Sequence, residues 1–181
     1  MSGVKISIDH ILDKPLLLNF EEPVESFKLL NEMQMDQYCS FIGPIRGEIS
    51  VLREFDHLRV NGRVTAPVAF SCSRCLTEYD SLIDSNFTIL FRKDAGEYFE
   101  DEIELGENDL ISSSYSGDEI DLTHEIEEQV AIEIPLKPLC SHSCKGLCHV
   151  CGTDLNRSQC SCSNETINLK FSALKDFKVS S

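Results

Sequence analysis

The sequence predicts an α+β protein: an antiparallel, strand-rich body with an amphipathic helix and a C-terminal Cys-rich zinc-binding loop. Three observations support this fold class. Apolar and polar residues alternate over long stretches, one apolar pattern follows helical spacing, and eight of the nine cysteines form closely spaced pairs. We expect the β body, with an acidic excursion and the helix, over residues 1–136. A Cys-rich zinc-binding segment with a short terminal helix is expected over residues 137–181.

The strands of the body are predicted by alternation. The stretch up to residue 42 indicates a strand or two and a loop. Over residues 45–55 and again over 58–70, most alternate positions are apolar or glycine, which indicates two half-buried strands. The short break between them predicts a hairpin. A third alternating stretch over residues 83–91 places the pair Cys72 and Cys75 at the turn between the second and third strands.

Acidic residues are concentrated in one window. Residues 94–136 hold 15 Asp or Glu and no Lys or Arg, whereas the rest of the chain has 16 acidic and 16 basic residues. This window therefore accounts for the whole net charge of −15. Because residues 94–119 have few apolar side chains over much of their length, we expect a mobile acidic excursion there.

An amphipathic helix is predicted after this excursion. Asp121 is its candidate N-cap, and Pro135 is its expected end. Between them, apolar residues recur at helical spacing: Leu122, Ile126, Val130 and Ile134. A second, short helix near the C-terminus is expected from the spacing of Phe171, Leu174 and Phe177.

The sequence also indicates a compartment. The chain starts without a basic region followed by an apolar stretch, and no apolar stretch approaches the roughly 20 residues of a membrane span. We therefore expect a soluble, cytoplasmic protein with no membrane partner. Thiols stay reduced in that compartment, and nine cysteines cannot all pair within one chain, so metal binding is favoured over disulfides.

The paired cysteines match the ligand count of two tetrahedral zinc sites. We assign one site to Cys148, Cys151, Cys160 and Cys162. The other would join Cys72, Cys75, Cys140 and Cys144. A single site that uses Cys144 in place of Cys160 or Cys162, or one that uses only half of the Cys-x-Cys pair, stays open. We expect Cys39 to be a core residue, and His142 and His149 to be exposed.

Catalysis is not expected. All-cysteine zinc sites are closed, whereas a catalytic zinc keeps a position for water and has an acid or base nearby. The histidines show no spacing that indicates a triad or a general base. A metal-dependent nuclease or a redox protein is the less favoured alternative.

Motifs in the Cys-rich segment point to a family. They are Pro135-Leu136-Lys137-Pro138-Leu139-Cys140, the stretch from Cys144 through Cys148-His149-Val150-Cys151-Gly152 to Asn156, and Cys160-Ser161-Cys162. Together they resemble the YceD family, the large ribosomal RNA accumulation proteins. Cys72-Ser73-Arg74-Cys75-Leu76 and Ile120-Asp121-Leu122 are similar to the same family's pattern. The resemblance implies a bacterial or plastid factor in ribosome biogenesis, with no established catalytic chemistry.

We therefore expect a noncatalytic factor that binds large-subunit ribosomal RNA or its precursor particle. The chain lacks the overall basic excess of proteins that hold phosphates by charge, so RNA binding would use a local patch. Its candidate residues, beside or near the proposed zinc ligands, are Arg74, Lys145 and Arg157. The alternative is an adapter whose acidic residues 94–133 bind a basic ribosomal protein.

Overall fold

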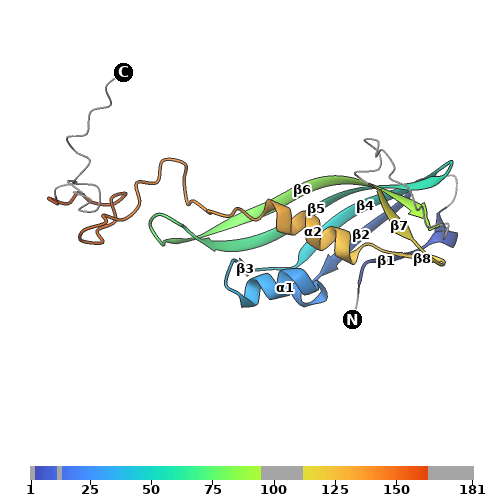
Figure 1. Cartoon of the computed structure of the whole chain (residues 1–181), viewed down its shortest axis with the longest axis horizontal. Coiled ribbons are helices and arrows are strands. Elements are labelled where there is room, and N and C mark those ends of the chain that lie inside the picture. The colour runs from blue at the N-terminus through green and yellow to red at the C-terminus, as the bar shows by residue number, and fades with distance from the viewer. Residues whose placement is uncertain (1–2, 12–13, 95–111, 163–181) are drawn as a thin grey trace, which may run out of the picture.

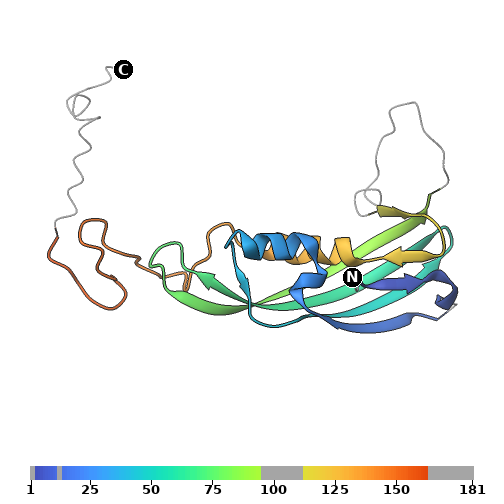
Figure 2. The ribbon, with the colours of Figure 1, turned by 90° about the horizontal axis from the view of Figure 1, so that it is seen from below.

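A computed structural model describes residues 3–11, 14–94 and 112–162. Its body is a curved sheet with two helices on one face, and the Cys-rich segment extends from one end of that sheet (Figures 1 and 2). The predicted strand-rich α+β fold is confirmed.

The main sheet has six strands, in the order β2-β4-β5-β6-β7, with β3 also paired to β5. The strands are β2 (Leu16–Glu22), β3 (Ser40–Phe41), β4 (Ile45–Glu54), β5 (His57–Ser71), β6 (Glu78–Lys93) and β7 (Ser112–Tyr115). All pairings are antiparallel except that of β6 with β7. A separate two-stranded sheet pairs β1 (Lys5–Ser7) with β8 (Glu119–Asp121). It lies at the end of the body far from the Cys-rich segment (Figure 1).

Two helices cover one face of the sheet, α1 (Lys28–Met35) and α2 (Thr123–Glu133) (Figure 2). Short 3₁₀ turns lie at Ile8–His10 and Val24–Ser26. The core between helices and sheet contains Leu30 and Ile126, both fully buried, and the inward-facing residues of β4, β5 and β6. Burial of each large side chain stabilises the fold by about 1.5–3 kcal/mol. No helix within the described ranges has the length and apolar character to cross a membrane.

A carboxylate of α2 joins the two helices. Glu127 Oε2 accepts a hydrogen bond from the Leu29 backbone amide at 2.9 Å, and Glu127 is only 8% exposed. The first amides of a helix have no partner within the helix, and its N-terminus is electropositive, so a carboxylate stabilises it there. His124 Nδ1 lies 3.3 Å from the other carboxylate oxygen. This acidic residue therefore belongs to the interior contact between α1 and α2.

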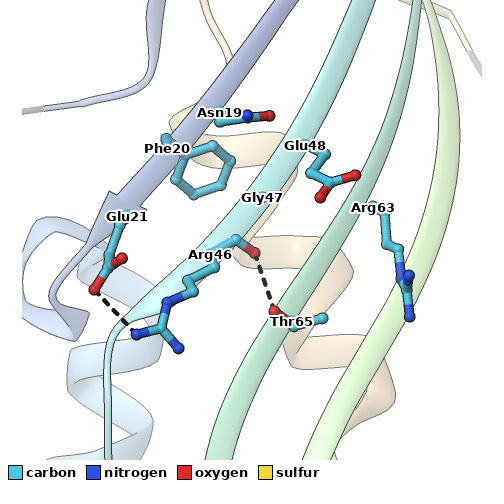
Figure 3. Close-up of a pocket in the computed structure, with 8 residues that line it drawn as sticks. All are labelled: Asn19, Phe20, Glu21, Arg46, Gly47, Glu48, Arg63 and Thr65. Atoms are coloured by element: carbon cyan, nitrogen blue, oxygen red, sulfur yellow. Dashed lines mark hydrogen bonds and ion pairs between the residues drawn. The ribbon is translucent and has the colours of Figure 1, made fainter.

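The opposite face of the sheet carries ion pairs between neighbouring strands. Figure 3 looks onto it with the helices behind the strands, at a shallow groove of about 470 Å³. Its cations are paired: Arg46 Nη2 lies 3.1 Å from Glu21, and Arg63 contacts Asp84 through two nitrogens. The charges of this face therefore largely neutralise one another.

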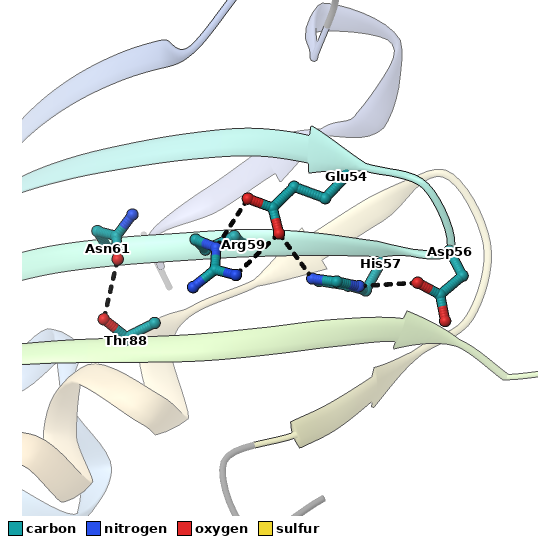
Figure 4. Close-up of polar contacts among 6 residues, drawn as sticks. All are labelled: Glu54, Asp56, His57, Arg59, Asn61 and Thr88. Carbon is teal, nitrogen blue, oxygen red and sulfur yellow. Dashed lines mark hydrogen bonds and ion pairs between the residues drawn. The ribbon is translucent and has the colours of Figure 1, made fainter. Parts of the chain in front are cut away.

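A polar network fixes the turn between β4 and β5 (Figure 4). The Glu54 carboxylate accepts two hydrogen bonds of 2.9 Å from Arg59 and lies 3.0 Å from His57 Nε2. The Arg59 guanidinium lowers the pKa of Glu54. On the neighbouring strand, Thr88 donates a hydrogen bond to Asn61. These contacts hold β4, β5 and β6 in register near this end of the hairpin.

The predicted strands over residues 45–55, 58–70 and 83–91 are confirmed as β4, β5 and the second half of β6. Cys39 is buried in the core, as expected. His142 and His149 are exposed, also as expected.

Three expectations differ from the structure. The stretch up to residue 42 contains the unpredicted helix α1, whose eight residues are too few for a clear helical pattern. The expected excursion over 94–119 is wrong at its end, because residues 112–115 form β7 on the edge of β6. The helix begins at Thr123, one residue later than expected, although Asp121 Oδ1 still accepts a hydrogen bond from the Thr123 amide. Residues 95–111 and the expected helix near residue 174 lie outside the described part of the chain.

Gly62 provides a test of the packing of this sheet. A Cβ at this position would overlap the ring of Phe87 on β6, which is rigid and buried in the core. We predict that Gly62→Val lowers the free energy of unfolding by about 1–3 kcal/mol, measured by chemical denaturation. The control Thr65→Val, on the open face of the same strand, should change it by less than about 0.5 kcal/mol. Equal changes in the free energy of unfolding for the two substitutions would contradict the packing of the Phe87 ring over Gly62.

Candidate metal centre

The structure gathers the eight paired cysteines into two groups of four. Within each group, all Sγ atoms lie within 4.8 Å of one another. The first cluster consists of Cys72, Cys75, Cys140 and Cys144. The second cluster consists of Cys148, Cys151, Cys160 and Cys162. These are the same two sets that the spacing of the cysteines suggests.

The sulfur separations suit a tetrahedral metal ion. Cys72 Sγ lies 3.8 Å from Cys144 Sγ, and Cys75 Sγ lies 3.6 Å from Cys140 Sγ. Four sulfurs at a Zn–S distance of about 2.3 Å around one ion would be about 3.8 Å apart. Each cluster could therefore hold a metal ion, and the four thiolate donors are compatible with zinc.

The first cluster forms at the far end of the hairpin of β5 and β6. The turn closes through hydrogen bonds from the Cys72 amide to Thr77 O at 3.0 Å and from the Leu76 amide to Cys72 O at 2.9 Å. Leu76 adopts a left-handed conformation, with φ of 59°. The segment after α2 reaches this turn where Pro138 O accepts a hydrogen bond from the Ser73 amide at 2.8 Å. Two cysteines thus come from each side of the domain boundary expected at residues 136 and 137.

The first cluster is the more buried of the two. Cys72, Cys75 and Cys144 are buried, with Tyr79, Leu139 and Leu147 packed against them. This apolar surrounding excludes water from three of the four sulfurs. The first cluster and these apolar side chains therefore form a small core that joins the Cys-rich segment to the sheet.

The second cluster lies in a loop, where only Cys148 is buried. The loop turns through hydrogen bonds of 2.8 Å from the Cys148 amide to Thr153 O and from the Gly152 amide to Cys148 O. Gly152 has φ of 75°, a conformation that side chains disfavour. The sequence analysis missed Thr153, whose hydroxyl lies 3.1 Å from Cys151 Sγ. A hydroxyl residue two positions after the second cysteine of the pair is the signal that could have revealed it.

Each cluster contains thiols with lowered pKa values beside thiols with raised ones. A hydrogen bond from the Cys140 backbone lowers the pKa of Cys72 to about 6, against the opposing effect of burial. Hydrogen bonding with Cys75 raises the pKa of Cys140 to about 12. In the second cluster, the Thr153 hydroxyl lowers the pKa of Cys151 to about 6, and Cys151 raises that of Cys162 to about 12. Four neighbouring thiolates repel one another, so full ionisation needs a bound cation.

The three candidate RNA-binding residues lie at this same end of the molecule. Arg74 is exposed, but its Nη1 donates a hydrogen bond of 2.8 Å to Cys144 O. Lys145 is exposed, and Arg157 is 79% exposed with its Nε 3.5 Å from Asp154 Oδ2. Arg74 therefore has a structural contact, whereas the other two side chains reach solvent.

Positive side chains offset the charge of the cysteines here. Residues 72–76 and 137–162 contain four Lys or Arg and one Asp. A Zn²⁺ ion with four thiolates carries a charge of −2, so two loaded clusters would bring this region to a net charge of about −1. RNA binding would therefore depend on the placement of individual cations.

A curved sheet with helices on one face and two four-cysteine clusters at one end defines a β-rich protein with a Cys-rich appendage that could hold metal ions. Residues 60–178 match the family described as Large ribosomal RNA subunit accumulation protein YceD. This match covers more than half of the chain, and the protein belongs to the YceD family.

Curated relatives support this assignment. The large ribosomal RNA subunit accumulation protein YCED homolog 1, chloroplastic, of Arabidopsis thaliana is 29% identical over 143 residues, which are 67% of this chain and 44% of the relative. The Zea mays protein of the same name is 29% identical over 66% of this chain and 48% of its own. An uncharacterized protein of Mycobacterium leprae (strain TN) is 35% identical over 62% of this chain and 49% of its own. The chain thus spans about half the length of the curated relatives it matches. No solved structure matches it.

Metal affinity should depend on pH. Protons compete with the metal for every thiolate, and Cys140 and Cys162, with pKa values of about 12, must lose a proton when metal binds at neutral pH. We predict that the affinity for a divalent metal ion falls at least about tenfold for each unit of pH lost between 8 and 6. The fall should steepen below pH 6, where Cys72 and Cys151 also become protonated. Competition with a chelator, corrected for the chelator's own protonation, measures this, and a flat profile would contradict it.

Proposed function

We propose that this protein is a noncatalytic ribosome biogenesis factor needed for accumulation of large-subunit ribosomal RNA. Membership in the YceD family, together with the names of the two plant relatives, is the observation that carries this proposal. The plant relatives are chloroplastic by name, and we expect this chain to act in the cytoplasm.

Zinc is the proposed cofactor, held by the two clusters. The residues fit it because four soft thiolates at suitable separations surround each position. When bound, the ions would supply structural cross-links, since four cysteine ligands leave no position for a reacting water. This donor set supports a noncatalytic role.

Zinc stoichiometry tests the cofactor. We predict two zinc ions per chain, falling to one in the double variant Cys72→Ser/Cys75→Ser, because that variant removes half of the first cluster's ligands. Elemental analysis of the purified full chain measures this. The control Cys39→Ala removes the cysteine that belongs to neither cluster and should leave two ions. One ion per chain that survives the double substitution would contradict the two-site assignment.

The proposed partner is large-subunit ribosomal RNA or its precursor particle. Lys145 and Arg157 are the best-placed contacts, since both side chains reach solvent beside the second cluster. Charged side chains and exposed amides of such loops can hold phosphates and unpaired bases. We propose Arg74 as a weaker contact, because its guanidinium already binds Cys144 O.

Crosslinking in the protein's own cells tests RNA binding, with bound RNA sequenced and bound proteins identified from one sample. Lys145→Glu/Arg157→Glu should lower crosslinking to precursor large-subunit RNA about tenfold, because each change removes a phosphate contact and adds repulsion. The matched control Lys5→Glu/Lys28→Glu reverses two exposed cations elsewhere and should change little. Equal loss in both variants would contradict a contact at the Cys-rich end.

The same sample tests the acidic adapter. The charge asymmetry favours this alternative, but three carboxylates of α2 already accept hydrogen bonds within the fold. Glu127 binds the start of α1, Glu125 binds Ser113, and Glu133 binds Ser85. Crosslinks to a basic ribosomal protein without RNA would favour the adapter.

A further inference from the structure

The two clusters are linked by one amide side chain. Asn156 lies in the loop of the second cluster, between Cys151 and Cys160. Its Nδ2 donates a hydrogen bond to Cys144 Sγ of the first cluster at 3.4 Å, and its Oδ1 accepts one from the Lys145 amide at 2.7 Å. A residue of one loop thus bonds directly to a sulfur of the other cluster.

The second loop fixes the position of Asn156. Its backbone amide and its Nδ2 both donate to Asp154 Oδ1, at 2.9 and 2.8 Å. The next residue along the loop, Arg157, donates its amide to Asp154 O at 3.2 Å. The side chain is therefore held by a turn that ends three residues before Cys160 and forms part of the chain that the second cluster closes.

Backbone contacts continue this link to the turn between β5 and β6. The Leu155 amide donates to Gly146 O, and the Leu147 amide donates to Arg74 O, both at 3.0 Å. Gly146 has φ of 74°, and a Cβ there would lie 3.0 Å from Arg74 O, so glycine permits the close approach. The loops of both clusters pack on the short segment between Cys144 and Cys148.

We propose that the two zinc sites bind metal cooperatively and that Asn156 carries the coupling. This inference rests on the zinc binding of the proposed function. Metal at the second cluster orders the turn of residues 154–156, which presents the amide donor to Cys144. A donor aimed at a ligating sulfur stabilises the negative charge of the loaded first cluster. The coupling is reciprocal, so metal at the first cluster strengthens binding at the second by the same factor.

Zinc competition with a chelator measures this coupling in the full-length chain. Cys160→Ser/Cys162→Ser leaves only the first cluster, and Cys72→Ser/Cys75→Ser leaves only the second. Each single-site variant gives one zinc dissociation constant, and the unaltered chain gives the product of its two stepwise constants. If the sites were independent, that product would equal the product of the two single-site constants. We expect it to be about tenfold smaller, because each bound ion strengthens binding of the other.

Asn156→Asp removes the proposed donor. The carboxylate keeps an acceptor for the Lys145 amide but has no donor for Cys144 Sγ or for Asp154 Oδ1. The factor of ten should disappear when Asn156→Asp is introduced into all three chains. The matched control Gln159→Glu makes the same change of charge in the same loop, where Gln159 lines the groove beside the second cluster. It should leave the factor unchanged.

Two results would overturn the proposal: equal products in the unaltered and single-site chains, or a factor of ten that survives Asn156→Asp. Circular dichroism of each variant shows whether the sheet remains folded. If the unaltered chain crosslinks to ribosomal RNA but its two sites bind zinc independently, only this inference is refuted. If the two sites are coupled but the unaltered chain does not crosslink to ribosomal RNA, only the proposed function is refuted.

Discussion

The packing of four cysteine sulfurs into one small site is the constraint on which the attachment of the Cys-rich segment depends. In the first cluster, sulfurs from positions more than 60 residues apart approach to 3.6 and 3.8 Å in a largely buried site. Negative charges at such distances repel strongly where water is excluded. A divalent cation would turn that repulsion into attraction, so the proposed zinc ion would add a cross-link to the hydrogen bonds that already join the two segments, such as the one from the Ser73 amide to Pro138 O. The path of the chain from Pro138 to Cys144 brings these sulfurs together.

On the helical side of the body, a buried carboxylate stabilises the contact between α1 and α2. Glu127 is buried, yet it has a partner in the Leu29 amide and another in His124. A buried carboxylate without partners would be costly, whereas one at a helix N-terminus satisfies amides that lack partners. This contact links α1 to α2 although the two helices lie almost 100 residues apart. Part of the acidic surplus of residues 94–136 therefore stabilises the fold.

An element can be predicted from the sequence when its own residues carry the pattern that forms it, and not when distant residues stabilise it. The strands β4 and β5 are predictable because one face is buried, so alternation is imposed on residues such as Val60 and Val64. β7 is not predictable, because its serines pair with β6 through backbone contacts that leave no apolar pattern. Helix α1 is short, and its N-terminus is stabilised by a distant residue.

In the candidate site, the cysteine groups are predictable from the sequence, whereas the contacts around them are not. Paired cysteines separated by short loops suggest two groups of four, and the structure brings those groups together, while the bound metal stays a prediction. The contacts around them are different. The bonds that Arg74 and Asn156 make to Cys144 join separate loops, so no spacing in the sequence reveals them.

The length of the β5–β6 hairpin has a mechanical consequence. β6 has 16 residues, so at about 3.4 Å per residue the hairpin places the first cluster roughly 50 Å from the turn at the other end of β5. The helices pack on the sheet, and the clusters extend beyond it (Figure 2). The core around Leu30 and Ile126 contains none of the cysteines of either cluster. Loss of the proposed metal ions would therefore loosen the Cys-rich segment from the sheet, while the sheet and its two helices would stay folded.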